Sequence, residues 1–185
     1  MTVSTSRLQF EWVPSPNFTP SEHRAITCLV VHATATSGIE SPRRWLCDPT
    51  AKKSAHYLIG KDGTVLQLVQ DKDIAWHAGE SEWKGKKWVN HFSIGIELVN
   101  LNDGKDPYPL AQLNSCQDLL SELCQDYGVN PIDVIGHKDV APGRKSDPVG
   151  FPFEAVRKNL ATSLTKEITS LWIRTLSFIQ KFLSY

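Results

Sequence analysis

The chain has 185 residues, and its twenty basic and twenty acidic side chains give a formal net charge of zero. A chain of this length is typically one domain that buries roughly two thirds of its unfolded surface. It needs no disulfide bond or structural metal ion in order to fold. Without net charge there is no long-range field that would draw the protein to nucleic acid or to an anionic membrane, so nucleic acid is not an expected partner.

The four cysteines and the N-terminus bear on the cellular compartment. Cys28, Cys47, Cys116 and Cys124 lack the spacing of a zinc ribbon. They are expected to be buried thiols, with one disulfide left open as the alternative. The first residues carry no apolar run, so neither a secretory signal nor a transmembrane segment is expected there. This favours a cytoplasmic location, or release by lysis if the gene is viral.

The first part of the chain predicts an arm, a strand and a short helix. Residues 1–24 are rich in proline, serine and threonine, and we expect an arm without regular structure that lies over the domain. The apolar run at 27–32 predicts the first core strand. A short helix is predicted next, with Ser41 as its N-cap and Pro42 at its first position.

Two β elements follow in the middle of the chain. Residues 54–60 and 64–69 are predicted to pair as a hairpin, because the residues between them form a turn sequence. Residues 92–100 read as a buried strand interrupted by Gly95 and Glu97. An ionised carboxylate in a buried sheet costs several kcal/mol unless it is paired, so Glu97 is expected to have a function.

The last part of the chain predicts a helix, a strand and a second helix. Apolar residues recur at helical spacing over 110–127, and Gly128 follows as a stop signal. The last core strand is predicted at 131–140. A long helix is then predicted from about residue 154 to the C-terminus.

Histidines end two of the predicted strands. His137 opens a loop in which a Pro-Gly turn lets Asp147 double back towards it. Lys145 lies two residues before Asp147 and therefore faces the same point in extended geometry. His32 ends the first core strand in the same way. Two histidines and one carboxylate suffice for a catalytic zinc ion, whereas either histidine alone would be an ordinary hydrogen-bonded residue at a strand end.

Several motifs, in this order along the chain, resemble the zinc-dependent N-acetylmuramoyl-L-alanine amidases of the type 2 family. The resemblance covers about residues 25–153, and Glu97 is typical of the AmpD-like and AmiD-like members. The motifs are Val30-Val31-His32, Ser54-Ala55-His56-Tyr57, Ala75-Trp76-His77-Ala78-Gly79, Asn90 with Ser93-Ile94-Gly95-Ile96-Glu97, and Gly136-His137 through Arg144-Lys145-Ser146-Asp147-Pro148.

The resemblance implies a mixed α/β fold. Its central sheet would have five or six strands flanked by helices, with a zinc site in a cleft at one edge and an extra C-terminal helix. The site residues that it implies are His32, His137 and Asp147 as ligands of one zinc ion, Glu97 as the proton acceptor and Lys145 as the oxyanion donor. Weaker candidates for the substrate pocket are His56, Trp76, His77 and Asn90, for which local hydrogen bonding is the alternative.

The resemblance also implies the reaction: hydrolysis of the amide between N-acetylmuramic acid, in ordinary or 1,6-anhydro form, and L-alanine. The implied partners are peptidoglycan fragments in cell-wall recycling. The alternatives are a non-catalytic peptidoglycan-binding module and a lytic amidase for intact wall. One departure concerns peptide specificity, because Trp88 stands where AmpD-like and AmiD-like enzymes usually carry an arginine. Trp83 and Trp88 are expected either to stack on sugar or to cover the core edge.

The sequence divides into an arm at 1–24, a catalytic domain at 25–153 and a C-terminal helical extension at 154–185. The last stretch, 171–185, is apolar enough to pack on the domain, to pair with a second subunit or to lie on a membrane surface. Packing or pairing is preferred. The apolar stripe of the extension consists of Val156, Leu160, Leu164, Ile168, Leu171, Trp172, Leu176, Ile179 and Leu183.

Overall fold

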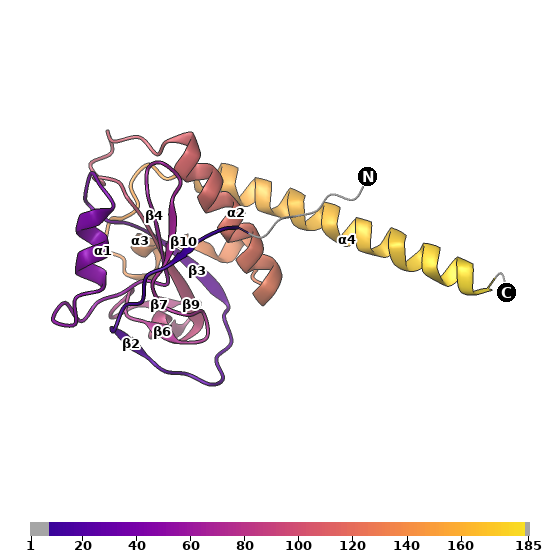
Figure 1. The fold of residues 1–185 in the computed structure, drawn as a ribbon, viewed down its shortest axis with the longest axis horizontal. Helices are drawn as coiled ribbons and strands as arrows, with labels where there is room; N and C mark the ends of the chain where they lie inside the picture. The colour runs from indigo at the N-terminus through magenta and orange to yellow at the C-terminus, as the bar shows by residue number, and fades with distance from the viewer. Residues whose placement is uncertain (1–7, 184–185) are drawn as a thin grey trace.

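The computed structural model describes residues 8–183 and places one sheet at the centre of the protein (Figure 1). The six strands of this sheet are β1 (Glu11–Trp12), β3 (Cys28–Ala33), β4 (Tyr57–Ile59), β5 (Val65–Gln67), β9 (Ser93–Leu98) and β10 (Val134–Gly136). Their order across the sheet is β1-β5-β4-β9-β3-β10. The pairs β4–β9, β9–β3 and β3–β10 are parallel, and β4 and β5 are antiparallel. The mixed sheet and the predicted hairpin are confirmed.

The other elements surround this sheet. The helices are α1 (Glu40–Leu46), α2 (Leu110–Tyr127), α3 (His137–Val140) and α4 (Phe153–Leu183), and the remaining short strands pair as β2 (Phe18–Thr19) with β6 (Ile74–Ala75) and β7 (Glu82–Trp83) with β8 (Lys86–Lys87). Helix α2 ends as predicted, because Gly128 takes a left-handed φ of 65° after it. The four cysteines are free thiols, in agreement with the expectation of reduced cysteines.

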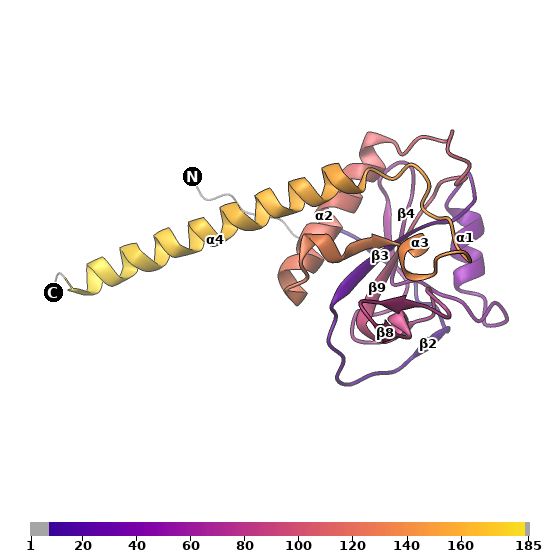
Figure 2. The ribbon, with the colours of Figure 1, turned by 180° about the vertical axis from the view of Figure 1, so that it is seen from behind.

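The two faces of the sheet are covered by different elements. Val31 and Ile96 lie in the main core cluster with side chains of α2 and α4, and Figures 1 and 2 show these two helices side by side. Val30 and Leu58 belong to clusters on the opposite face, near α3 and α1. Because side chains alternate along a strand, the residues that follow Val31 and Ile96, namely His32 and Glu97, project from this second face.

Three expectations about local structure were wrong. The arm was expected to lack regular structure, but it contains two short strands: β1 pairs with β5 at the edge of the main sheet, and β2 pairs with β6. Helix α1 begins at Glu40 with Ile39 before it, so Ser41 lies inside the helix rather than at its N-cap. The segment 131–140 holds a 3-10 turn, the three-residue strand β10 and helix α3, rather than one long strand.

Helix α4 confirms the predicted C-terminal helix, and its first turns belong to the core. Val156 and Leu160 are buried, and Leu164 packs against the same cluster. Further on, the helix extends away from the rest of the protein (Figures 1 and 2). Among the residues described, no helix has the length and apolarity needed to cross a membrane. The side chains of the apolar stripe at Ile168, Leu171, Leu176, Ile179 and Leu183 lie outside the described set, as do residues 1–7 and 184–185.

Candidate metal centre and active site

Strand register brings the two histidines together. In the parallel pair β3–β10, Gly136 stands opposite Val31, so His137 comes next to His32 at the carboxyl ends of both strands. Asp147 returns beside them, because its carbonyl accepts a hydrogen bond of 2.9 Å from the backbone N–H of Lys138. A Cβ atom at position 136 would lie 3.0 Å from Cδ of Pro148, so a glycine there lets the loop approach closely. Strand β10 is an edge strand, as the prediction of a site at one edge requires.

The three candidate ligand atoms lie at the separations of a tetrahedral site. Nδ1 of His32 is 3.0 Å from Nδ1 of His137, and Oδ2 of Asp147 is 3.2 Å from Nδ1 of His137 and 3.5 Å from Nδ1 of His32. Ligand atoms at about 2.0–2.1 Å from a tetrahedral metal ion are roughly 3.3 Å apart. The arrangement therefore fits a small divalent cation without movement of the backbone.

The protonation of the histidines also suits a cation. Nε2 of His137 lies 3.3 Å from the carbonyl oxygen of Ala78, which can only accept, so Nε2 carries the proton and Nδ1 offers a lone pair. Burial lowers the pKa of His32 to about 4, which keeps this imidazole neutral at physiological pH. Neutral imidazoles are the form in which histidine binds a metal.

Glu97 lies directly beside the ligands. It stands opposite His32 in the register of β9 and β3, and both side chains project from the same face of the sheet. Its Oε2 atom is buried and has no hydrogen-bond partner among residues 8–183. Burial, and next the charge of Asp147, raise the pKa of Glu97 to about 8, whereas Lys145 and Lys53 oppose this rise. Glu97 is thus a strong proton acceptor without a structural partner.

Lys145 supplies a positive charge beside the ligands and Glu97. It is half-buried, and its charge acts on both Glu97 and His32. No ion pair in the described part of the chain holds its ammonium group, which therefore stays available to a bound molecule.

The weaker candidates lie in the walls behind the site. His56 is fully buried, and its Nδ1 accepts from the N–H of Gly95 at 2.9 Å while Nε2 lies 3.1 Å from the carbonyl oxygen of Asp73. Trp76 donates from Nε1 to Thr19 at 3.0 Å. Both residues make the local hydrogen bonds that were the alternative to substrate binding, and a contact with substrate stays a prediction for each.

The other two weaker candidates are joined to each other. Oδ1 of Asn90 accepts from the backbone N–H groups of His77 and Ala78 at 3.2 and 2.8 Å. His77 is half-buried, and its Nδ1 lies 3.0 Å from Nε2 of His32. Asn90 therefore fixes the loop that carries both His77 and the carbonyl group that His137 contacts.

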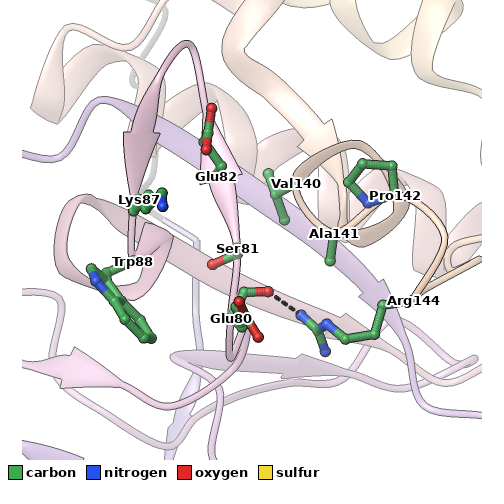
Figure 3. Close-up of a pocket in the computed structure, with 9 residues that line it drawn as sticks. All are labelled: Glu80, Ser81, Glu82, Lys87, Trp88, Val140, Ala141, Pro142 and Arg144. Atoms are coloured by element: carbon green, nitrogen blue, oxygen red, sulfur yellow. Dashed lines mark hydrogen bonds between the residues drawn. The ribbon is translucent and has the colours of Figure 1, made fainter.

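A charged cleft of about 410 Å³ opens on one side of the site (Figure 3). Arg144 lines this cleft and donates from Nη2 to the carbonyl oxygens of Ala78 and Glu80 at 2.7 and 2.5 Å. Trp88 is 58% exposed in the cleft and has a left-handed φ of 64°. Trp83 instead packs at the core edge. The lining residues are Glu80, Ser81, Glu82, Lys87, Trp88, Val140, Ala141, Pro142 and Arg144.

A second cleft, of about 200 Å³, reaches Glu97 from the side of α1. Its wall carries hydroxyl groups, together with Trp45, which is 54% exposed. Sequence reasoning missed these hydroxyl groups and Trp45. The chain bends after β3, where Ala35 takes a left-handed φ of 55°, so the two-residue period of the strand does not continue to Thr36. The lining residues are Thr34, Thr36, Ser41, Pro42, Trp45, Leu46 and Glu97.

Comparison with known protein sequences identifies relatives that carry the name of one activity. Residues 22–150 match the family model described as N-acetylmuramoyl-L-alanine amidase. The chain is 36% identical over 179 residues to the 1,6-anhydro-N-acetylmuramyl-L-alanine amidase AmpD of Enterobacter cloacae, covering 85% of this chain and 93% of that protein. It is 36% identical over 138 residues to the N-acetylmuramoyl-L-alanine amidase AmiD of Escherichia coli, covering 66% of this chain but only 49% of AmiD. The chain thus spans about half the length of AmiD.

Solved structures agree with the sequence comparison. A selenomethionine derivative of AmpD superposes with a TM-score of 0.72 and 30% identity, over 82% of this chain and 93% of that one. AmiD from E. coli, in complex with the substrate anhydro-N-acetylmuramic acid-L-Ala-D-gamma-Glu-L-Lys, superposes with a TM-score of 0.68 and 33% identity, over 72% and 57%. Family model, relatives and fold together establish that this chain belongs to the type 2 N-acetylmuramoyl-L-alanine amidase family.

Proposed function

We propose that the protein is a zinc-dependent amidase that hydrolyses the bond between N-acetylmuramic acid and L-alanine in soluble muropeptides, including the 1,6-anhydro form, during cell-wall recycling. The observation that carries this proposal is the convergence of His32, His137 and Asp147 within 3.0–3.5 Å, with Glu97 beside them. The match to nearly the full length of an AmpD named for the anhydro substrate supports the choice of substrate.

Zinc is the metal that this donor set favours. Two imidazoles and one carboxylate leave one position open, which is the arrangement of a catalytic zinc site. When bound, a zinc ion supplies Lewis acidity, which raises the acidity of water and polarises a carbonyl group.

The side chains around the ligands have two roles: one transfers protons and the other stabilises the negative charge that develops. Glu97 accepts a proton from the attacking water while the oxygen of that water bonds to the lactyl carbonyl carbon. Lys145 stabilises the negative charge that develops on the carbonyl oxygen. When the C–N bond breaks, Glu97 passes its proton to the nitrogen of L-alanine. The products are the muramic carboxylic acid and a peptide with a free amino terminus.

The pH profile should depend on the charge of Lys145. The reaction needs ionised Glu97, and the positive charge of Lys145 lowers the pKa of Glu97. Lys145→Met removes this effect, so the pKa rises and the acid limb of kcat/KM should move to higher pH. The rate at the optimum should fall about a hundred- to a thousandfold, the usual loss for one oxyanion donor. The pH dependence of kcat/KM on a muramyl tripeptide tests this.

Lys145→Arg is the matched control, because it keeps the charge and should leave the acid limb near its wild-type position. An acid limb that stays at the same pH in Lys145→Met would show that Lys145 does not act on the proton acceptor.

The two clefts suggest how the substrate lies across the site. The cleft that reaches Glu97 offers hydroxyl groups and the exposed ring of Trp45, which suit a sugar. The cleft in Figure 3 offers Arg144, Lys87 and two glutamates, which suit a peptide that carries both charges. The amide bond between sugar and peptide would then lie over the metal ligands.

Loss of the Trp45 ring should weaken binding of the sugar. Trp45→Ala is expected to raise KM for a muramyl tripeptide about two- to tenfold with kcat little changed, the effect of one aromatic contact. Trp45→Phe should restore most of the loss. Trp172→Ala removes a similarly exposed tryptophan on α4 and serves as the control. An unchanged KM in Trp45→Ala would place the sugar elsewhere.

The choice between fragments and intact wall has a direct test. Equal amounts of stem peptide, presented as anhydro-muropeptides or as purified sacculi, are incubated with the protein, and released peptide is measured by mass spectrometry. The recycling proposal predicts rapid release from the fragments and little from the sacculi. Comparable rates would make the protein a lytic amidase instead.

Three expectations stay predictions. They are the cytoplasmic location, the division at residues 24 and 153, and a homo-oligomer or surface contact through the C-terminal helix. The projecting part of α4 in Figures 1 and 2 is consistent with the third.

A further inference from the structure

A row of hydrogen-bonding groups lies behind the ligand His32. Nε2 of His32 is 3.0 Å from Nδ1 of His77, and Nε2 of His77 is 3.1 Å from Oγ of Ser93. The hydroxyl group of Ser93 donates in turn to the carbonyl oxygen of Val89 at 2.7 Å. The row begins at a backbone carbonyl group and ends at a metal ligand. None of its side chains other than His32 touches the metal position.

Chemistry allows only one direction for these hydrogen bonds. A carbonyl oxygen can only accept, so the single hydroxyl proton of Ser93 is donated to Val89. The oxygen of Ser93 must then accept a hydrogen bond from His77. Nε2 of His77 therefore carries a proton, and a neutral imidazole carries a proton on only one of its two nitrogens. Nδ1 of His77 is then a bare acceptor, and Nε2 of His32 must donate to it. This leaves the lone pair of His32 on Nδ1, the atom that faces His137 and Asp147.

We propose that His77 is a positioning residue that holds His32 in the tautomer whose Nδ1 can bind the metal. The inference rests on the metal ligands of the proposed function but not on the reaction. In the other tautomer of His32, two bare nitrogens would face each other at 3.0 Å and a proton would occupy the metal position. Outer partners of this kind typically contribute ten- to a hundredfold to metal affinity.

The backbone around His77 leaves room for its imidazole ring and holds the residue in place. A Cβ atom at position 95 would lie 2.3 Å from Cγ of His77, closer than any real contact, so only glycine leaves room for the imidazole. Asn90 fixes the backbone on the other side, through the hydrogen bond from the N–H of His77 to Oδ1. The break in the apolar pattern of β9 at Gly95 is thus explained by the ring that lies over it.

The test measures zinc affinity and the histidine tautomers, neither of which requires turnover. Zinc affinity is measured by competition with a chromophoric chelator for the wild type and for His77→Phe, which keeps a ring but removes the acceptor. We expect the affinity of His77→Phe to be ten- to a hundredfold lower. His77→Gln supplies both an acceptor for His32 and a donor for Ser93, and should recover affinity to within about threefold of the wild type.

Two controls separate positioning from a general structural effect. His91→Phe replaces an exposed histidine outside the row and should leave zinc affinity unchanged. His56→Gln replaces a fully buried histidine that has no hydrogen bond to the ligands, so it should lower stability but not zinc affinity. A loss of affinity confined to His77→Phe supports the row, and an equal loss in His56→Gln would overturn it.

The tautomers give a readout that does not depend on any variant folding. In metal-free wild-type protein, two-bond ¹H–¹⁵N spectra of the imidazoles should show His32 and His77 both protonated on Nε2. Protonation of either residue on Nδ1 would overturn the proposal, as would wild-type zinc affinity in folded His77→Phe. A wild type that binds zinc in this way but cleaves no muropeptide would refute the proposed function and leave this inference standing.

Discussion

His137→Ala should lose both bound zinc and nearly all amidase activity. Removal of one of three protein ligands leaves an incomplete site, in which the remaining imidazole and carboxylate hold the ion weakly. Lewis acidity is worth several kcal/mol to the reaction, so kcat/KM on a muramyl tripeptide should fall by roughly a thousandfold or more. The checks are zinc content per chain, measured by mass spectrometry of the metal, and the rate of peptide release.

His23→Ala is the matched control, because His23 is exposed and lies outside the metal site. It should keep one zinc ion and full activity. A His137→Ala protein that still holds one zinc ion per chain and works within tenfold of the wild type would show that the metal, or the reaction, lies elsewhere.

Glu97→Gln should abolish proton transfer while leaving the metal site intact. Glutamine has nearly the same shape but cannot accept a proton, and general base catalysis typically contributes about a hundred- to ten thousandfold. The value of kcat should fall by that factor, whereas zinc affinity should stay near the wild-type value because Glu97 is not a ligand. Single-turnover rates on a muramyl tripeptide, together with the chelator competition, measure the two quantities separately.

Glu82→Gln is the comparison for Glu97→Gln, since Glu82 is an exposed carboxylate in the neighbouring cleft. It should keep most of kcat. If Glu97→Gln keeps more than about a tenth of wild-type kcat, another group must take the proton, and the role given to Glu97 is wrong.

The local pattern of β9 predicts much of this site. Its apolar residues Ile94 and Ile96 face the main core, and the two positions that break the pattern, Gly95 and Glu97, both project from the opposite face. A buried carboxylate without an apparent partner marks Glu97 from sequence, because its desolvation must have a reason. Gly95 indicates that another group lies close to the backbone of β9, but the sequence does not identify that group.

The identity of that neighbour could not be predicted, because the contact is not local. His77 and His32 are 45 positions apart, and their hydrogen bond exists only once a loop folds over β9. Sequence shows that His77 is a candidate but cannot choose between substrate and ligand as its partner. Trp45 was missed for the same reason, since its place in the cleft depends on how α1 packs.

The wrong expectations about local structure also arise from tertiary contacts. Strand β1 has only two residues and forms because β5 offers an edge, so no local pattern signals it. Residues 131–140 were predicted to form one strand because of the apolar run within them, yet only β10 pairs with β3 before the chain turns into α3. His137 therefore begins a helix rather than an extended loop, and its side chain still reaches the site.

The central claim is that the site cleaves muramyl peptides and needs its metal to do so. The most direct measurement is mass spectrometry of a muramyl tripeptide after incubation with zinc-loaded protein, with chelator-stripped protein and with stripped protein given zinc again. We predict free tripeptide with the first, almost none with the second and recovery with the third. Zinc-loaded protein that binds the glycopeptide but releases no peptide would contradict the claim and make this chain a recognition module.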